Sequence, residues 1–247
     1  MTVPVWADEV VASLNYPVVF ATVSGAHLYG FSSVDSDLDL RGAHALPLAE
    51  LVGLRTGPET LQAGGVRDGV ELDVVTHELA KFCRLLLGRN GYVLEQLLSP
   101  LVVTTSPLHE ELVAAAPGCL TRHHAHHYLG FARTQWALFE RTGELKPALY
   151  TLRVLLTGRH LMYSGEMVCD LERLAAGMDL PYVPELIAAK AAGEHWPMPT
   201  STGLRARLHA DVSRLTALLR DLGPEWVLWR PFRTKICLSG TPGRTPT

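Results

Sequence analysis

The chain has 247 residues, of which 47% are hydrophobic and 19% charged, and its formal net charge at pH 7 is −3. These values exclude a disordered chain. The small negative charge also excludes nucleic-acid binding through a global basic field, so any such partner needs a local patch. The length suits one large domain or two small ones.

The four cysteines are scattered without a CxxC pair, a pattern that indicates reduced thiols rather than a disulfide framework. No apolar run approaches the roughly 18 residues that cross a bilayer. The N-terminal stretch MTVPVWADEV lacks the charged and apolar regions of a signal peptide. We therefore expect a cytoplasmic protein without a membrane partner.

The N-terminal elements are predicted to be strands. The β-branched run YPVVFATVSG (16–25) predicts a buried strand that ends in a glycine turn. DLDLRGAHA (37–45) alternates polar and apolar side chains and predicts a second strand. GVELDVVTHEL (69–79) begins as a third strand and turns helical near Thr76, the predicted N-cap. The Gly-rich polar segment over 55–69 predicts a mobile surface loop.

The rest of the chain is predicted to be mainly helical. ELAKFCRLLLG, VLEQLLS and SPLHEELVAAA have helical periodicity, and the last of them is predicted to end before Pro117 and Gly118. The proline-containing stretch over 180–202 predicts a connector around one short helix. Three longer helical segments are predicted over 120–142, 147–164 and 203–222.

This order of elements predicts an α+β protein, with a mixed sheet and flanking helices in its N-terminal half and helices alone in its C-terminal half. No internal repeat is visible. The predicted units are a sheet-containing catalytic domain over 1–117, a helical domain over 118–235 and a disordered tail over 236–247.

Three aspartates occupy strand positions from which their side chains can meet. Residues i and i+2 of a strand point to the same side, so Asp37 and Asp39 project together while the leucines beside them point into the core. The same alternation on the third predicted strand presents Asp73. Carboxylate oxygens suit Mg²⁺, and two such ions about 3.5–4 Å apart can support nucleotidyl transfer. For the DxD pattern alone, a solvated turn is the competing interpretation.

Longer motifs resemble the nucleotidyltransferases of the DNA polymerase β superfamily. That superfamily carries a glycine turn, a short gap, a DxD pair and a third aspartate on a later strand, and this chain offers Gly25, Asp37, Asp39 and Asp73 in that order. The chain is similar to the RNA-repair-associated branch through HELAKFCRLLLGRNGYVLEQLLSP and KPALYTLRVLL. The resemblance covers roughly residues 17–165.

The resemblance implies a polymerase β-like fold in which the helical domain closes a nucleotide cleft. It implies transfer of a nucleoside monophosphate from a nucleoside triphosphate, foremost ATP, to a hydroxyl, with an RNA end as the leading acceptor. The implied cofactor is Mg²⁺, with Mn²⁺ as the alternative, and the implied catalytic and metal-binding residues are Asp37, Asp39 and Asp73. The implied nucleotide-binding residues are Gly25, Ala26, His27, Tyr29, Arg41, Lys146, Tyr150 and Arg153.

One residue departs from the family pattern, since Ala26 stands where a serine usually follows the turn glycine. Loss of that hydroxyl should weaken nucleotide binding, although backbone N–H groups of the turn can still hold phosphate. Two other hypotheses therefore stay open beside the RNA-end enzyme. One is the same chemistry on a protein or small-molecule hydroxyl, and the other is a nucleotide-binding sensor that has lost turnover.

Several candidate residues also have a purely structural interpretation. Arg41 can steady the carboxylates, reach a phosphate or form a strand-end ion pair, and Tyr29 can stack on a base or cap the core. Lys146, Tyr150 and Arg153 form one helix stripe that suits a triphosphate or a solvated face.

Two further groups are expected to be structural or peripheral. His123 and His127 have an i, i+4 spacing that can bind Zn²⁺, but no HExxH frame or cysteine partner accompanies them, which favours a surface helix. Asn90 and Glu95 are expected to fix the following loop rather than to perform chemistry.

Overall fold

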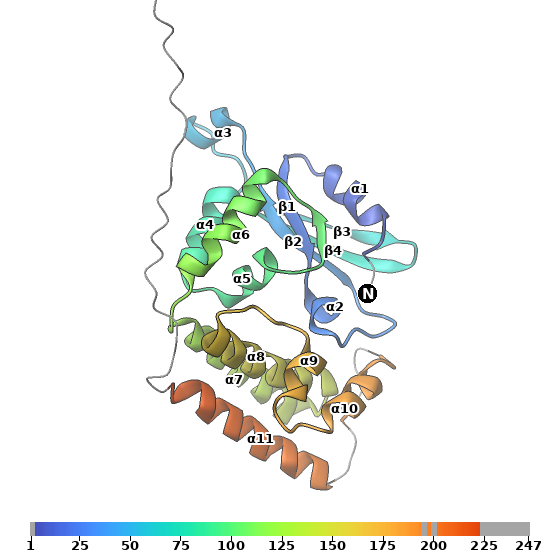
Figure 1. Ribbon diagram of the computed structural model, residues 1–247. Coiled ribbons are helices and arrows are strands. Elements are labelled where there is room, and N and C mark those ends of the chain that lie inside the picture. Colours follow the sequence, from blue (N-terminus) through green and yellow to red (C-terminus); the bar gives the residue numbers. More distant parts are fainter. Residues whose placement is uncertain (1–2, 194–196, 199–201, 223–247) are drawn as a thin grey trace, which may run out of the picture.

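A mixed five-stranded sheet forms the core of the N-terminal half (Figure 1). The computed structural model describes residues 3–193, 197–198 and 202–222, so the predicted tail over 236–247 lies outside the described residues. The strand order is β3-β4-β2-β1-β5, with β2 and β4 parallel and all other neighbours antiparallel. The strands are β1 (Val18–Val23), β2 (Leu38–His44), β3 (Thr60–Arg67), β4 (Val70–Glu78) and β5 (Val102–Thr104).

The two central strands follow from their side-chain patterns. Strand β1 is buried along its whole length except at Val18, as its β-branched run predicts. Strand β2 alternates at its start, where Leu38 and Leu40 are fully buried and Asp39 between them is half-buried. The predicted α+β class with a mixed sheet is confirmed.

Helices cover both faces of the sheet. Helix α1 packs with Ala7 and Val11 on the face that carries Leu38 and Leu40. The opposite face is covered by α4, α5 and α6, where Phe20 of β1 meets Phe82 edge to face (Figure 1). The helices of this half are α1 (Trp6–Ala12), α2 (Gly25–Tyr29), α3 (Leu48–Val52), α4 (Leu79–Leu87), α5 (Gly91–Leu97) and α6 (Pro107–Cys119).

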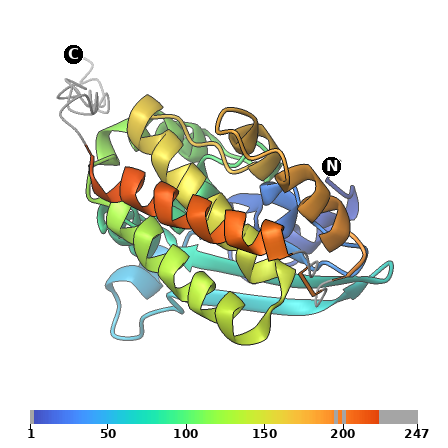
Figure 2. The same ribbon diagram turned by 90° about the horizontal axis from the view of Figure 1, so that it is seen from below.

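The C-terminal half is helical, as predicted. Figure 2 shows α11 lying across the long helices α7 and α8. None of the helices in the described part of the chain has the length and apolarity that a bilayer crossing requires. The helices are α7 (His124–Thr142), α8 (Leu145–Ser164), α9 (Leu171–Ala176), α10 (Val183–Lys190) and α11 (Thr202–Arg220).

One continuous hydrophobic core joins the two halves. It runs from Val19 and Phe20 of the sheet through Leu152 of α8 to Leu219 of α11. The predicted division near residue 117 stays a prediction, and α6 continues through Pro117 to Cys119 rather than ending before it. Pro117 lies in the last, exposed turn, so the hydrogen bond that it cannot donate is lost at the end of the helix rather than in its middle.

The predicted N-cap Thr76 is wrong. Thr76 lies inside β4, fully buried, and its hydroxyl is 2.9 Å from Nδ1 of His44. Glu78 caps α4 instead, since its carboxylate accepts hydrogen bonds from the backbone N–H groups of Ala80 and Lys81. Glutamate is not among the residues favoured at this position, so the sequence pattern misplaced the cap.

The predicted mobile loop over 55–69 is also wrong in its second half. Strand β3 occupies Thr60–Arg67 and pairs with β4 along its whole length. It is an edge strand with no fully buried residue and two adjacent glycines, so it lacks the apolar signal by which strands are recognised. The sequence analysis also did not predict the short helices α1, α2 and α3, the short strand β5 or, in the C-terminal half, α9 (Leu171–Ala176).

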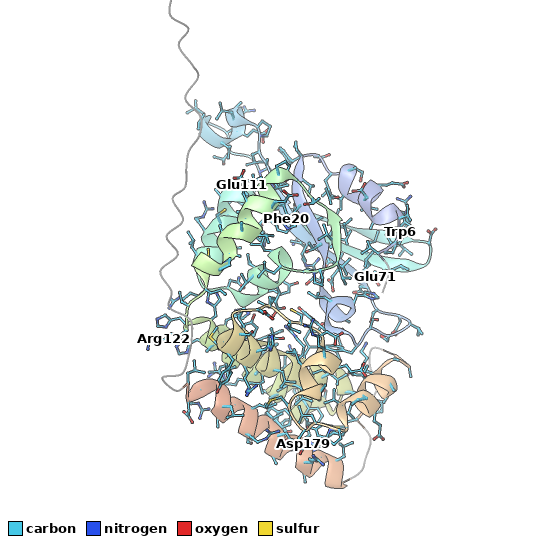
Figure 3. The ribbon with its side chains drawn as sticks, viewed as in Figure 1. Trp6, Phe20, Glu71, Glu111, Arg122 and Asp179 are labelled. Carbon is cyan, nitrogen blue, oxygen red and sulfur yellow. The ribbon has the colours of Figure 1, made fainter. Side chains whose placement is uncertain are left out.

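The cap on α4 gives a test of this local structure. We expect Glu78→Ala to destabilise the protein by about 1 kcal/mol, because two N–H groups at the helix start lose their acceptor. Urea unfolding measures the change. Glu71→Ala is the matched control, since Glu71 is an exposed carboxylate on the same strand (Figure 3), and equal effects of the two substitutions would contradict the capping role.

Candidate functional site

The parallel pairing of β2 with β4 brings two of the predicted aspartates together. In this register Asp39 lies opposite Asp73, and their neighbours Leu38 and Leu72 are also paired and buried. Because neighbouring side chains in register point to the same face, both carboxylates stand on the face opposite the leucines. Two like charges at this separation repel each other, so the pair needs a cation.

Arg41 is the cation that lies between these carboxylates. Its Nη2 is 2.6 Å from Oδ1 of Asp39 and 2.6 Å from Oδ2 of Asp73. Its Nη1 donates to the backbone carbonyls of Leu40 and Asp73, and its Nε donates to the hydroxyl of Tyr92. The guanidinium is thus held from several sides in a nearly buried position, with its side chain 11% exposed.

The charges around Asp39 affect its protonation in opposite directions. Burial raises the pKa of Asp39, Arg41 opposes this shift, and the carboxylates of Asp73 and Asp37 add to it, while Lys146 opposes it weakly. Asp37 itself is exposed, just ahead of β2. The three aspartates and Lys146 therefore share one electrostatic environment, although they come from three separate segments of the chain.

The glycine turn after β1 lies directly against Asp39. Gly25 has φ +63°, and a Cβ built on it would lie 1.9 Å from Oδ2 of Asp39. The backbone N–H of Ser24 donates to the carbonyl of Asp39 at 2.9 Å. Only glycine allows both this backbone conformation and this close approach. The methyl group of Ala26 packs in the hydrophobic core, and His27 is half-buried, which lowers the pKa of its imidazole.

A buried ion pair lies behind the turn. Nη1 of Arg153 is 2.6 Å from Oε1 of Glu95, and the two side chains are 1% and 2% exposed. The hydroxyl of Tyr29 donates to Oε2 of Glu95 at 3.0 Å, and the Arg153 guanidinium lies 3.8 Å from the centre of the Tyr29 ring. Burial acts to lower the pKa of Arg153, but Glu95, together with smaller contributions from Tyr29, Cys169 and Tyr128, raises it overall. This cluster links α2, α5 and α8.

A cavity of about 670 Å³ opens between the two halves of the protein and reaches the turn and Asp39. Its volume falls within the range of small-molecule sites. Its lining combines aromatic rings with a few polar groups from α5 and α7. The lining residues are Gly25, Tyr29, Asp39, Asn90, Tyr92, Glu95, His126, His127, Gly130, Phe131, Thr134, Tyr150 and Arg153.

The structure therefore brings most of the predicted site residues together around one cavity. Gly25, Tyr29, Asp39, Tyr150 and Arg153 line the cavity. The rings of Tyr29 and Tyr150 meet edge to face at 5.6 Å, so each also packs the wall. The predicted helix stripe thus divides, because Lys146 is half-buried near Asp39 while Arg153 is fully buried against Glu95.

Some residues of this region were missed or given another role from the sequence. Glu95 was expected to fix a loop, but it is the buried partner of Arg153. Asn90 was also expected to fix a loop, but it caps α5, because its side-chain oxygen accepts a hydrogen bond from the backbone N–H of Tyr92, and it lines the cavity. The buried amine of Lys190 in α10 donates to Ser33 at 2.6 Å. This contact links residues 157 positions apart, and no sequence pattern signals it.

The carboxylates suit a divalent cation in their chemistry. In the parts of the chain that the structure describes, no group of three or more His, Cys, Asp or Glu side chains is arranged as a metal site. His123 and His127 are therefore not part of such a group either. Asp39 and Asp73 each accept a hydrogen bond from Arg41 through one oxygen. Asp73 is half exposed, and Asp37 is exposed. Hard oxygen ligands of this kind favour Mg²⁺ or Mn²⁺.

Comparisons with known proteins cover most of the chain. The sequence model of the RNA repair pathway DNA polymerase beta family (RlaP) matches residues 6–221. An uncharacterized protein of Methanocaldococcus jannaschii is 32% identical over 154 residues, and the match spans 62% of this chain and 63% of that protein. Among solved structures, a nucleotidyltransferase-like protein from Exiguobacterium sibiricum superimposes with a TM-score of 0.35 and 13% identity, covering 87% of this chain and 72% of that one.

The buried ion pair gives the second test. Arg153→Met should destabilise the protein by about 3–5 kcal/mol, because it leaves the Glu95 carboxylate buried without its cation. The double substitution Glu95→Gln with Arg153→Met should cost less than Arg153→Met alone, since no buried charge then remains. Guanidinium unfolding followed by fluorescence and circular dichroism measures these values.

Arg122→Met is the control for this test, because Arg122 is exposed near the start of α7 (Figure 3). Its substitution should change the free energy of unfolding by less than about 0.5 kcal/mol. An effect of Arg153→Met as small as that of the control would contradict the structural importance of the pair.

Proposed function

The chain belongs to the RNA repair pathway DNA polymerase beta family, and from this premise we propose that it is a metal-dependent nucleotidyltransferase. In this proposal a nucleoside monophosphate moves from a nucleoside triphosphate, foremost ATP, to a hydroxyl group at an RNA end. The observation that carries the proposal is the parallel register that sets Asp39 beside Asp73, with the Gly25 turn against Asp39 at the mouth of the cavity.

The nucleotide is proposed to lie along the cavity with its phosphates at the turn. Backbone N–H groups of a glycine turn bind phosphate oxygens, and the carboxylates stand beside the turn. The nucleoside would then lie toward Phe131 and Tyr150, whose rings can contact a base. Lys146, which already affects the pKa of Asp39, is the cation best placed for the phosphates. Arg153 would contribute as part of the wall, since Glu95 holds it.

The carboxylates are proposed to hold Mg²⁺ or Mn²⁺. Asp37 and Asp39 would be the main ligands, with Asp73 as the third, and Arg41 would keep Asp39 and Asp73 in place. When bound, the metal supplies positive charge to the attacking and leaving oxygens.

The proposed reaction is an in-line displacement. The oxygen of the acceptor hydroxyl forms a bond to the α-phosphorus, and the bond from this phosphorus to the oxygen that bridges to the β-phosphate breaks, so that pyrophosphate leaves. The proton of the hydroxyl passes to a carboxylate. We assign this role to Asp73, because it is half exposed and only its Oδ2 is engaged by Arg41.

A nucleotide-binding protein without turnover is the second candidate, and one observation favours it. Position 26, where the family usually has serine, holds an alanine whose side chain packs in the core. Incubation with labelled ATP, Mg²⁺ and RNA, protein or small-molecule acceptors separates the candidates. Transfer of label identifies the acceptor class, whereas binding of ATP without transfer to any of them supports the sensor.

Substitution of the aspartates tests the enzyme. Asp37→Asn and Asp39→Asn should each lower label transfer by at least about 100-fold, because each variant loses a negatively charged ligand that would hold the metal ion against the phosphates. The circular dichroism spectrum should not change, since a repelling carboxylate is removed. Glu111→Gln, on the outer helix α6 (Figure 3), should transfer label like the wild type. Transfer within about 3-fold of wild type in both aspartate variants would refute the assignment.

The glycine turn provides a steric test that removes no charge. Gly25→Ala should displace Asp39, because the new Cβ would lie 1.9 Å from its Oδ2. We expect weaker Mn²⁺ binding by calorimetry and loss of label transfer. Gly65→Ala is the control, since a Cβ at Gly65 would meet no atom within 4 Å. Unchanged Mn²⁺ affinity in Gly25→Ala would mean that Asp39 does not bind the metal.

A further inference from the structure

We propose that a groove across α7 binds the single-stranded end of an RNA acceptor and leads it to the carboxylates. This inference rests on the proposed function and names the surface that would recognise the acceptor. The groove joins the cavity beside Asp39 to a second cavity between α7, α8 and α11, and it crosses α7 at His126 and Gly130.

The second cavity has a volume of about 680 Å³. It shares two lining residues with the cavity at Asp39, so the two spaces meet on the surface of α7. Figure 2 shows α11 running beside α7 on the side of the helical half that faces away from the sheet. The lining residues are His126, Leu129, Gly130, Ala132, Arg133, Trp136, Thr151, Val212, Ser213, Thr216 and Arg220.

Gly130 has no side chain to block the place where the groove crosses α7. It lies in the interior of α7, where glycine weakens a helix relative to alanine. A Cβ at this position would meet no atom within 4 Å, so packing does not require the glycine. His126 and Thr134 lie one turn before and after it, on the same side of the helix. A missing side chain here leaves space for a chain to pass between the two cavities.

The second cavity is basic although the protein is acidic. None of its lining residues is an aspartate or glutamate, and the exposed Arg133 and Arg220 form no ion pair with any residue in the described part of the chain. Other arginines of α11 are neutralised. Arg205 is 3.8 Å from Glu140, and Arg214 is 2.8 Å from Asp211. Two guanidinium groups without an ion pair among the described residues, both on one cavity, suit phosphodiester groups.

Trp136 supplies a flat surface in the same cavity. Its ring contacts Phe139 at 5.0 Å and His209 at 4.8 Å, so the ring is held in one orientation while part of it remains accessible. An unpaired base can stack on such a ring, whereas a base inside a duplex cannot, which favours a single strand. The hydroxyls of Ser213 and Thr216 lie in the same lining and can bond to the sugar.

Binding of RNA to the full chain, without nucleotide, tests the groove. Fluorescence anisotropy with an end-labelled single-stranded RNA of about 12 nucleotides reports the Kd. The double substitution Arg133→Gln with Arg220→Gln should weaken binding at least about 10-fold and reduce the salt dependence by about two phosphate contacts. Trp136→Ala should weaken it at least about 5-fold, and Trp136→Phe should restore part of the affinity.

Arginines of α11 that already have carboxylate partners are the matched controls, so Arg205→Gln and Arg214→Gln should bind RNA like the wild type. Loss of RNA binding in these controls equal to that in the groove variants would overturn the proposal. So would a full chain that does not bind RNA, or one that binds DNA of the same sequence as tightly. If Trp136→Ala does not fold, the arginine variants, which alter only exposed side chains, still decide the outcome.

The failure of this inference can be distinguished from failure of the proposed function. Asp37→Asn should keep the RNA affinity of the wild type, because Asp37 lies outside the groove. RNA binding that depends on the groove, together with no label transfer to any acceptor, would refute the enzyme and support the groove. Label transfer to RNA that is unchanged in the groove variants would support the enzyme and refute the groove.

Discussion

Repulsion between two carboxylates held in register is the constraint around which the site is built. Parallel pairing of β2 and β4 fixes Asp39 beside Asp73, and neither strand can shift by one residue without turning its buried leucine outward. Arg41, on the same strand as Asp39, balances these charges, and Tyr92 holds Arg41 from α5. The hydrophobic core fixes the register of the strands, and the register fixes the positions of the two carboxylates. Their negative charge is balanced in part by Arg41, and a bound metal ion would balance the rest.

The buried pair of Glu95 and Arg153 extends this order to the helical half. Removing two charges from water costs free energy that offsets much of their Coulombic attraction, so a buried ion pair adds little net stability. It disfavours arrangements that would leave either charge buried without its partner. Glu95 binds Arg153 of α8 through one oxygen and Tyr29 of α2 through the other. The position of the helix that follows the Gly25 turn is therefore coupled to the position of α8. The cavity that both elements line takes its shape from this coupling.

The arrangement separates the proposed tasks between the two halves. The sheet presents the charged groups, which need rigid positions because small displacements weaken electrostatic catalysis. Helix α7 presents a histidine and aromatic surface on the cavity at Asp39 and an arginine and tryptophan surface on the second cavity. Such a division would let one fold keep the nucleotide chemistry constant while the helical half selects the acceptor.

The sequence by itself determined the features that depend on local periodicity. Alternation in DLDLRG predicted the buried leucines and the shared face of Asp39 and Arg41, and helical periodicity predicted α7, α8 and α11. Only the tertiary structure decided that β3 is a strand, because its exposed edge needs no apolar pattern. It likewise decided that Arg153 is fully buried and Lys146 only half-buried, since a helix stripe defines a face but not what covers it. Periodicity shows which residues share a face, but which charged side chain on that face is covered depends on contacts between residues far apart in the chain, and these contacts leave no local signal.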